Sequence, residues 1–121
     1  MTGRDYTQVE EFMEMIVKWV FKPAISDAIE LIEDPPGRKP HTSLVSLNEW
    51  YSILSAQEKE LVRKVATQAA DAALFGLFCA FDGVRNIGLN GEIKIVEDGH
   101  VLNDNLNLHE IYRSIATDIF E

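Results

Sequence analysis

Apolar residues recur at helical spacing in five parts of the chain, and each recurrence predicts a helical segment. The first segment covers residues 5–21. One stripe is formed by Val9, Phe12, Met13, Ile16 and Val20, and Val17 and Phe21 lie beside it. A second stripe, turned about the axis relative to the first, is formed by Ile25, Ala28, Ile29 and Ile32. Pro23 lies between them, lacks a backbone donor and disfavours a helical Lys22. We expect one long helix kinked near Pro23, with two helices meeting there as the alternative.

The longest segment runs from Ser55 to Phe81. Ser55 and Glu58 have the spacing of a capping box, and Asp82-Gly83 marks the end. An amphipathic stripe in the first half holds Leu61, Val62, Val65, Ala66 and Ala69. Residues 72–81 are apolar almost all round, and such a helix must be surrounded by other elements. The pattern predicts a central helix in which Phe75 and Phe78 are nearly fully buried.

Three prolines at 35–40 predict a loop between the second stripe and the next helix. Ser46 and Glu49 have the spacing of another capping box, which predicts a short helix starting at Ser46. That helix carries Leu47, Trp50, Tyr51 and Leu54. We expect Trp50 in the core, whereas Trp19 falls off its stripe and is either exposed or bridges to another element. The two boxes are so close that they predict a sharp corner between helices.

After Asp82-Gly83 the period changes from helix to strand. Residues 92–97 have strand composition, and Asp98-Gly99 is a two-residue hairpin signal. Direct pairing across the turn places Glu97 opposite His100, Val96 opposite Val101 and Ile95 opposite Leu102. Residues 84–87 are a candidate third strand, and the hairpin must lie against helices to be stable. Asn107 is then a candidate cap for a last helix with the face Leu108, Ile111, Tyr112, Ile115 and Ile119.

Together these elements predict a mainly α (α+β) fold. We expect residues 1–121 to form a single domain, a helical bundle around the central apolar helix with a C-terminal β-hairpin and final helix. The hydrophobic share of 46% and charged share of 26% are typical of a soluble globular chain. A single cysteine, Cys79, excludes an intrachain disulfide, and no secretory signal or bilayer-length apolar run is visible. We expect a cytoplasmic protein.

The net charge of −9 is concentrated at the two ends of the sequence. Residues 1–34 carry three basic and eight acidic residues, and residues 82–121 carry the same numbers, so each end has a net charge of −5. Such a field repels nucleic acid and anionic membranes and speeds the encounter with a basic protein. We therefore predict a basic protein partner that meets Glu10, Glu11, Glu14, Glu97, Asp98, Asp104 and Glu110. The alternative is that these groups are merely solvated.

No motif compels a chemistry, so we expect no catalytic residue, cofactor or metal site. Glu97 and His100 have a metal-ligand spacing, but Asp98-Gly99 makes this segment a turn. Cys79 is expected in the core, because it lies on an apolar helix without a nearby His. Arg85 is a candidate clamp that could pair with Asp82 or another acidic group. His41 and His109 have no partner visible in the sequence.

The C-terminal half also resembles known proteins. Residues 81–87, 92–96, 102–104 and 108–112 follow a layout of apolar helix, Asp-Gly turn, hairpin and Leu-rich segment. This layout resembles small uncharacterised bacterial proteins, and no function follows from the layout itself. In size and acidic charge the chain is also similar to immunity proteins, which neutralise a toxin by binding it.

The sequence therefore leaves three candidate functions. The first is a small acidic cytosolic protein-binding module, immunity-like, which neutralises a basic protein partner. The alternative is a homo-oligomeric structural or accessory protein, and an enzyme comes third.

Overall fold

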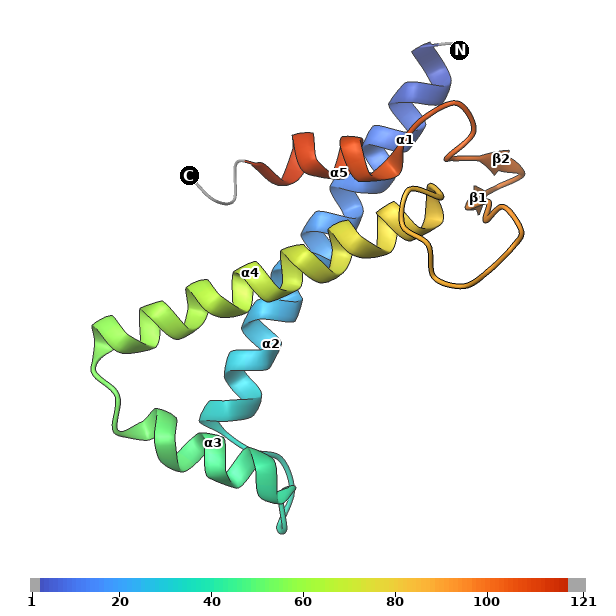
Figure 1. Cartoon of the computed structure of the whole chain (residues 1–121). Helices are drawn as coiled ribbons and strands as arrows, with labels where there is room; N and C mark the ends of the chain where they lie inside the picture. Colours follow the sequence, from blue (N-terminus) through green and yellow to red (C-terminus); the bar gives the residue numbers. More distant parts are fainter. Residues whose placement is uncertain (1–2, 118–121) are drawn as a thin grey trace. The chain divides into compact units, whose positions relative to one another are not determined.

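The computed structural model describes residues 3–117 of the chain, and it is mainly α-helical with a small hairpin before the last helix (Figure 1). In chain order the elements are α1 (Gly3–Ile16), the π-helical η1 (Val17–Phe21), α2 (Lys22–Glu33), α3 (Thr42–Ser52), α4 (Ala56–Phe81), β1 (Val96–Glu97), β2 (His100–Val101) and α5 (Leu108–Ala116). The fold class predicted from the sequence is confirmed. No helix among these residues combines the length and the apolarity that a bilayer crossing requires.

The chain divides into two compact units. The terminal unit comprises residues 1–20 and 72–121, and the middle unit comprises residues 21–71. The single-domain organisation stays a prediction, and each unit is described in turn.

In the terminal unit, α5 packs across α1, and the C-terminal turns of α4 complete the core (Figure 1). Its buried apolar side chains are Val9, Met13, Val17, Phe78, Cys79, Ala80, Leu102, Leu108, Ile111, Tyr112 and Ala116. The ring centroids of Phe78 and Tyr112 lie 5.6 Å apart, which joins α4 to α5. Ile119 of the predicted α5 face lies outside the described residues. The core location of Cys79 is confirmed.

The expected irregularity before Pro23 takes the form of a π-helical turn at Val17–Phe21. Proline lacks an N–H, and its ring crowds the carbonyl four residues earlier, so a wider turn with i→i+5 bonds relieves both problems. The helical run continues through this turn from α1 into α2 without a loop. Val17 and Phe21, predicted beside the stripe, are buried, whereas Val20, predicted within it, is 45% exposed.

The second half of α4 is buried on one side only, so the all-round burial predicted for residues 72–81 is wrong. Phe78 is 3% exposed, but Phe75 is only half-buried and Leu77 is 45% exposed. The predicted end of the helix is confirmed. The N–H of Gly83, whose φ is +79°, donates to the Ala80 carbonyl at 3.2 Å, and the N–H of Val84 donates to the Cys79 carbonyl at 3.0 Å. These are the two bonds of a Schellman motif, which favours glycine at the left-handed position.

The predicted hairpin register is confirmed, with Val96 opposite Val101 and Glu97 opposite His100. The hairpin is shorter than predicted, because residues 92–95 lie outside β1, and the candidate strand at 84–87 does not form. The N–H of Leu102 still donates to the Ile95 carbonyl at 2.7 Å, and a side chain holds the residues around Ile95 in place. Asn103 Nδ2 donates to the carbonyls of Ile93 at 2.8 Å and Phe81 at 3.2 Å, and its Oδ1 accepts from the N–H of Ile95 at 3.0 Å. Asn103 therefore fixes the segment before the hairpin to the end of α4.

In the middle unit, α3 packs beside α2 through polar contacts at the C-terminal end of α2. Asn48 Nδ2 donates to the carbonyls of Ile32 at 2.9 Å and Glu33 at 3.1 Å, which have no partners within the helix. The Tyr51 hydroxyl donates to Glu33 Oε1 at 3.1 Å. Desolvation raises the pKa of Tyr51, and the Glu33 carboxylate raises it further.

The capping box at Ser55 is confirmed and the one at Ser46 is wrong. The N–H of Ser55 donates to Glu58 Oε1 at 2.9 Å, and the N–H of Glu58 donates to Ser55 Oγ at 3.1 Å. Ser46 lies inside α3, which starts four residues earlier, where His41 Nδ1 accepts from the N–H of Ser43 at 3.1 Å. The sequence pattern missed this cap because a histidine ring nitrogen took the place of the usual hydroxyl or carboxylate.

The two tryptophans are both exposed. Trp50 is 48% exposed, so its predicted core position is wrong, and the half-exposed Leu47 beside it shows that this face of α3 is not covered. Trp19 is 64% exposed, as the first of the two alternatives for it predicted. The predicted corner is confirmed, since only residues 53–55 separate α3 from α4.

Candidate functional site

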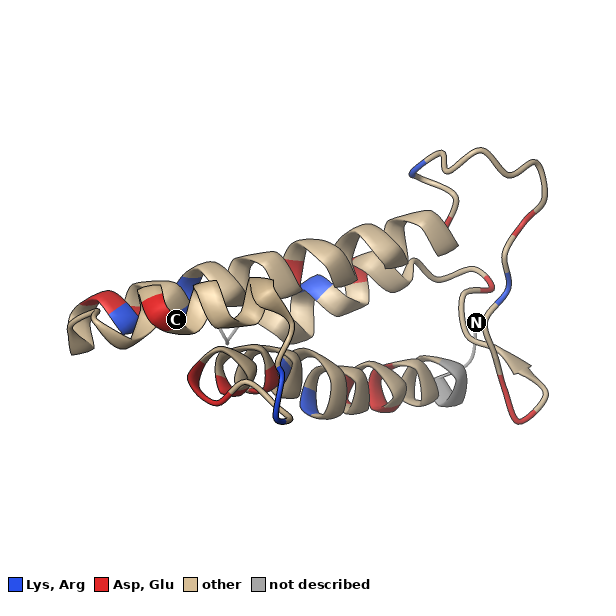
Figure 2. Ribbon diagram, turned by 90° about the horizontal axis from the view of Figure 1, so that it is seen from below, with Lys and Arg blue, Asp and Glu red and all other residues tan. Residues whose placement is uncertain are grey.

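The seven acidic residues predicted to meet a partner all belong to the terminal unit. The α1 helix carries Glu10, Glu11 and Glu14, the hairpin turn carries Glu97 and Asp98, and Asp104 and Glu110 lie before and within α5. All are exposed except Glu10, which is half-buried. The tip of the hairpin is acidic in Figure 2.

A hydrogen bond from α1 holds the hairpin tip in place. Gln8 Nε2 lies 3.0 Å from Glu97 Oε1 and 3.4 Å from the Glu97 carbonyl oxygen, so the amide can donate to both. Glu11 lies three residues after Gln8 and is its neighbour on the helix surface. The contact therefore brings the carboxylates of Glu11 and Glu97 to the same side of the unit, although they are far apart in sequence.

Asp104 belongs to the same region. It lines a hollow of about 240 Å³ together with Gln8 and the turn residues Gly99 and His100. Its Oδ1 lies 4.0 Å from Lys94 Nζ, which also lies 3.7 Å from Glu92 Oε2. Exposed pairs at these distances contribute little energy, so Asp104 keeps its charge available to a partner. We call Glu11, Glu97, Asp98 and Asp104 the hairpin acidic group.

The other three predicted residues are not joined to this group by the Gln8 contact. Helical periodicity puts Glu10 about 160° round the axis from Gln8, and Glu14 about 120° round. Glu110 lies in the first turn of α5, where an acidic residue interacts favourably with the helix dipole. The seven carboxylates therefore consist of one group at the hairpin and three more distant charges.

A second feature of the terminal unit is a buried pair that the sequence did not reveal. Asp82 Oδ2 accepts from the backbone N–H of His109 at 2.9 Å and lies 2.7 Å from His109 Nδ1. A carboxylate can only accept, so Nδ1 carries the proton. The Asp82 side chain is 1% exposed and that of His109 is 15% exposed.

The pair closes the N-terminal end of α5. The predicted cap, Asn107, occupies the N-cap position but makes no side-chain capping bond. Asp82 supplies that bond from 27 residues away in the sequence. A distal cap of this kind leaves no sequence spacing to recognise, and the only signals are an Asp at a helix end and a His in the first turn of another helix.

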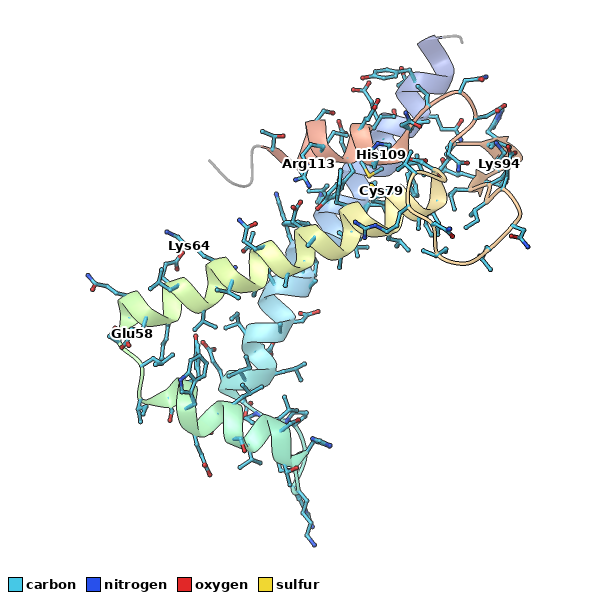
Figure 3. All side chains as sticks on the ribbon, in the orientation of Figure 1. Glu58, Lys64, Cys79, Lys94, His109 and Arg113 are labelled. Carbon is cyan, nitrogen blue, oxygen red and sulfur yellow. The ribbon has the colours of Figure 1, made fainter. Side chains whose placement is uncertain are left out.

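Phe75 packs against the histidine ring, and Arg113 packs over Phe75. The ring of His109 meets Phe75 edge-on with centroids 5.8 Å apart, and the Arg113 guanidinium lies 4.6 Å from the centroid of Phe75. His109 and Arg113 are labelled along α5 in Figure 3. Phe75 is half-buried, and the guanidinium over its ring makes a cation–π contact.

Arg85 does not take the role predicted for it. The Asp82 carboxylate is held by His109, and the Arg85 guanidinium instead lies against Gly76, where an added Cβ would be 2.2 Å from Arg85 Nη1. His100 is exposed and lies opposite Glu97, as expected for a turn histidine. Within residues 3–117, no group of three or more His, Cys, Asp or Glu side chains is arranged to hold a metal ion.

The charge of the molecule is unequally divided between the two units. The terminal unit has twelve Asp and Glu against five Lys and Arg, a net charge of −7. The middle unit has eight against six, a net charge of −2. The net charge of −5 on residues 82–121 lies wholly in the terminal unit, whereas that on residues 1–34 is divided, with −2 in the terminal unit and −3 in the middle unit.

Comparison with known proteins gives no relative, since no protein-family model, curated protein or solved structure matches the chain.

Proposed function

We propose that this chain is a small acidic protein-binding module of the immunity-protein kind, which neutralises a basic protein partner by direct binding. The observation that carries the proposal is the net charge of −7 on the terminal unit. A field of one sign speeds the approach of an oppositely charged partner and excludes partners of like charge.

The hairpin acidic group supports a specific contact surface within that field. Asp98 and Gly99 both have positive φ, at +49° and +80°, as a tight two-residue turn requires. Gln8 fixes Glu97 from the side. Carboxylates on a turn held in this way lose little conformational freedom on binding, which lowers the cost of forming charged contacts.

A second candidate function is self-association, and exposed apolar side chains favour it. In the middle unit, Trp50 is 48% exposed, Leu61 59% and Val65 69%. Leu61 and Val65 belong to the amphipathic stripe of α4, so they are one turn apart on the same face. A mass measurement of the purified chain alone separates the two functions, because only self-association predicts a mass above that of the monomer.

The test of the first candidate is affinity capture from the native cell with three baits. The baits are the natural chain, the double variant Glu97→Gln with Asp98→Asn, and a control, Asp27→Asn with Glu30→Gln. The hairpin substitutions remove charge but keep an oxygen for Gln8 and a residue that tolerates positive φ. The control removes the same charge from exposed positions of the middle unit.

We expect a basic protein to be captured by the natural chain and the control, and captured less by the hairpin variant. Equal capture by all three baits would show that the hairpin acidic group is not the contact surface. Capture of no basic protein would overturn the proposal.

A further inference from the structure

The N-terminal half of α4 carries apolar side chains that the chain leaves uncovered. Leu61 is 59% exposed and Val65 is 69% exposed, and Ala69 is exposed as well. Their four-residue spacing puts them in one row along the helix, and we call Leu61, Val65 and Ala69 the α4 stripe. None of residues 56–70 is buried. A helix of about 15 residues depends on packing of its apolar face for most of its stability, so the stripe requires a second surface.

The charges around the stripe identify the kind of surface that fits it. Residues 55–71 have no net charge, because three acidic residues are balanced by three basic ones, namely Glu58, Glu60, Asp71, Lys59, Arg63 and Lys64. The terminal unit has a net charge of −7 and is therefore the part that attracts a basic partner. A surface with equal numbers of both charges complements a copy of itself, because each positive group can meet a negative group of the second copy. The occupant that fits the α4 stripe is a second copy of this chain.

Glu60 and Lys64 are placed for such a contact. Both are exposed, and helical periodicity puts Lys64 about 60° and Glu60 about 100° round the axis from Leu61, on the same side. In an antiparallel pair related by a two-fold axis between Leu61 and Val65, each Leu61 meets the Val65 of the other copy. The side that carries Glu60 and Lys64 then meets the same side of the second copy. Along the helix, Glu60 of each copy lies within about 3 Å of the level of Lys64 in the other.

The charge of the terminal units decides between antiparallel and parallel pairing. Residues 72–81 continue α4 into the terminal unit, whose net charge is −7. A parallel pair of α4 helices would bring two such units to the same end, where like charges repel. An antiparallel pair sends them to opposite ends, so electrostatic repulsion favours the antiparallel arrangement.

We infer that the chain forms a symmetric dimer through the α4 stripe, with antiparallel helices and with Glu60 of each copy paired with Lys64 of the other. The inference rests on the second candidate function, self-association, and gives it a surface and a geometry. It uses no residue of the hairpin acidic group, so the dimer is compatible with capture of a basic partner by the terminal unit.

The first test is sedimentation equilibrium of the purified chain from about 10 µM to 1 mM, because a contact this short belongs to the small, weak interfaces. We expect the mass to rise from that of the monomer toward that of the dimer. The variant Leu61→Gln with Val65→Gln removes the apolar contact but keeps good helix formers, and it should dimerise at least about tenfold more weakly. Trp50→Gln is the control on α3, where Trp50 is 48% exposed, and it should dimerise like the natural chain.

The second test reverses the charges one at a time at low ionic strength. Glu60→Lys alone and Lys64→Glu alone each put like charges opposite each other, so each should dimerise at least about fivefold more weakly. An equimolar mixture of the two variants restores both attractive pairs, and it should dimerise at least as tightly as the natural chain. Arg63→Glu changes the net charge by as much as Lys64→Glu does, but it lies about 160° round the axis from Leu61 and should have little effect.

Monomeric mass at every concentration would overturn the inference and self-association together, and would leave the first candidate function standing. A dimer that Trp50→Gln disrupts and the stripe variant does not would keep self-association and overturn the stripe as its surface. Equal weakening by Arg63→Glu and Lys64→Glu, or a mixture as weak as the single variants, would overturn the antiparallel pairing.

Discussion

At the residue scale, the capping box at the start of α4 shows how two side chains set a helix end. Ser55 and Glu58 each satisfy the other's backbone N–H, so two of the four unpaired donors of the first turn are accounted for. Both partners lie within three residues, which is why the sequence alone predicted them.

Ser55→Ala should therefore lower the free energy of unfolding by about 1 kcal/mol. Ser46→Ala is the matched control, because Ser46 lies inside α3, where alanine is the better helix former. Urea unfolding of the two variants checks the difference. A loss from Ser46→Ala as large as that from Ser55→Ala would contradict the assigned cap.

Glu58 gives this cap a pH dependence. The hydrogen bonds from Ser55 lower the pKa of the Glu58 carboxyl in the folded chain. Its stabilising contribution is therefore present at pH values above the pKa of the unfolded chain, and is lost as the pH falls through the lowered folded pKa. Urea unfolding of the natural chain and Glu58→Gln over a pH series should show a stability difference that shrinks on acidification. A difference that grows toward low pH would reverse the assigned sign.

Phe78 and Phe75 should differ in their contributions to stability, although both lie on α4. Phe78 is 3% exposed and packs on Tyr112, so Phe78→Ala should cost about 3–5 kcal/mol. Phe75 is half-buried under Arg113, so Phe75→Ala should cost less than Phe78→Ala. Denaturant midpoints of the two variants give the order, and equal losses would mean that the partial exposure of Phe75 is irrelevant.

At the element scale, the end of α4 and the start of α5 are joined by the Asp82 carboxylate. The same carboxylate follows the last residue of one helix and caps the first turn of another. Asn103 adds a second connection, because its amide reaches the carbonyl of Phe81 and the strand segment before the hairpin. Asp82 thus joins α4 to α5, and Asn103 joins α4 to the segment before the hairpin, whose own ladder is short.

Asp82→Ala should release the first turn of α5 before the rest of the unit. It removes the acceptor of the His109 N–H and should cost about 1–2 kcal/mol, as the loss of a helix cap does. Hydrogen exchange is the measurement, and the His109 amide should lose protection while amides in the middle of α4 keep theirs. Unchanged protection at His109 would contradict the distal cap.

The sequence predicted those elements whose determinants are local. The turn at Asp98-Gly99 fixed the hairpin register, and Gly83 marked the end of α4, because positive φ at these positions requires particular residues. Asp82 and His109 could not be paired from the sequence, since nothing in their spacing records the contact. The burial predicted for Phe75 and Trp50 was wrong. An apolar pattern shows which side chains would gain from burial, but not whether another element of the fold covers them.

At the scale of the whole molecule, the unequal charge of the two units predicts that the rate of association with a basic partner depends mainly on the terminal unit. The terminal unit has −7 of the net charge of −9, and it carries all seven predicted contact residues. The sequence did not show that four of these residues form the hairpin acidic group and three lie apart from it, because this division depends on the contact between Gln8 and Glu97. Charge that is concentrated in this way acts on the rate of encounter more than on the affinity.

Once a basic partner is captured, the variant Glu97→Gln with Asp98→Asn should associate roughly two- to tenfold more slowly at low salt. Its association rate should also fall less steeply with ionic strength than that of the natural chain, because fewer charges are screened. Stopped-flow or surface-binding kinetics over a salt series measure both quantities. The Asp27→Asn with Glu30→Gln control should keep the natural salt dependence, and an identical loss in that control would assign the steering to net charge alone.

The π-helical turn at Val17–Phe21 has a consequence for chain length. Each of its i→i+5 bonds encloses one residue more than an α-helical turn does, so the turn is equivalent to a one-residue insertion. Deletion of a single residue there would leave an ordinary α-helical turn with its backbone bonds intact. Lys18 and Trp19 are both exposed in this turn, so the loss of either would remove little packing. A relative whose first helical run is one residue shorter would thus be expected to have lost a residue at this turn.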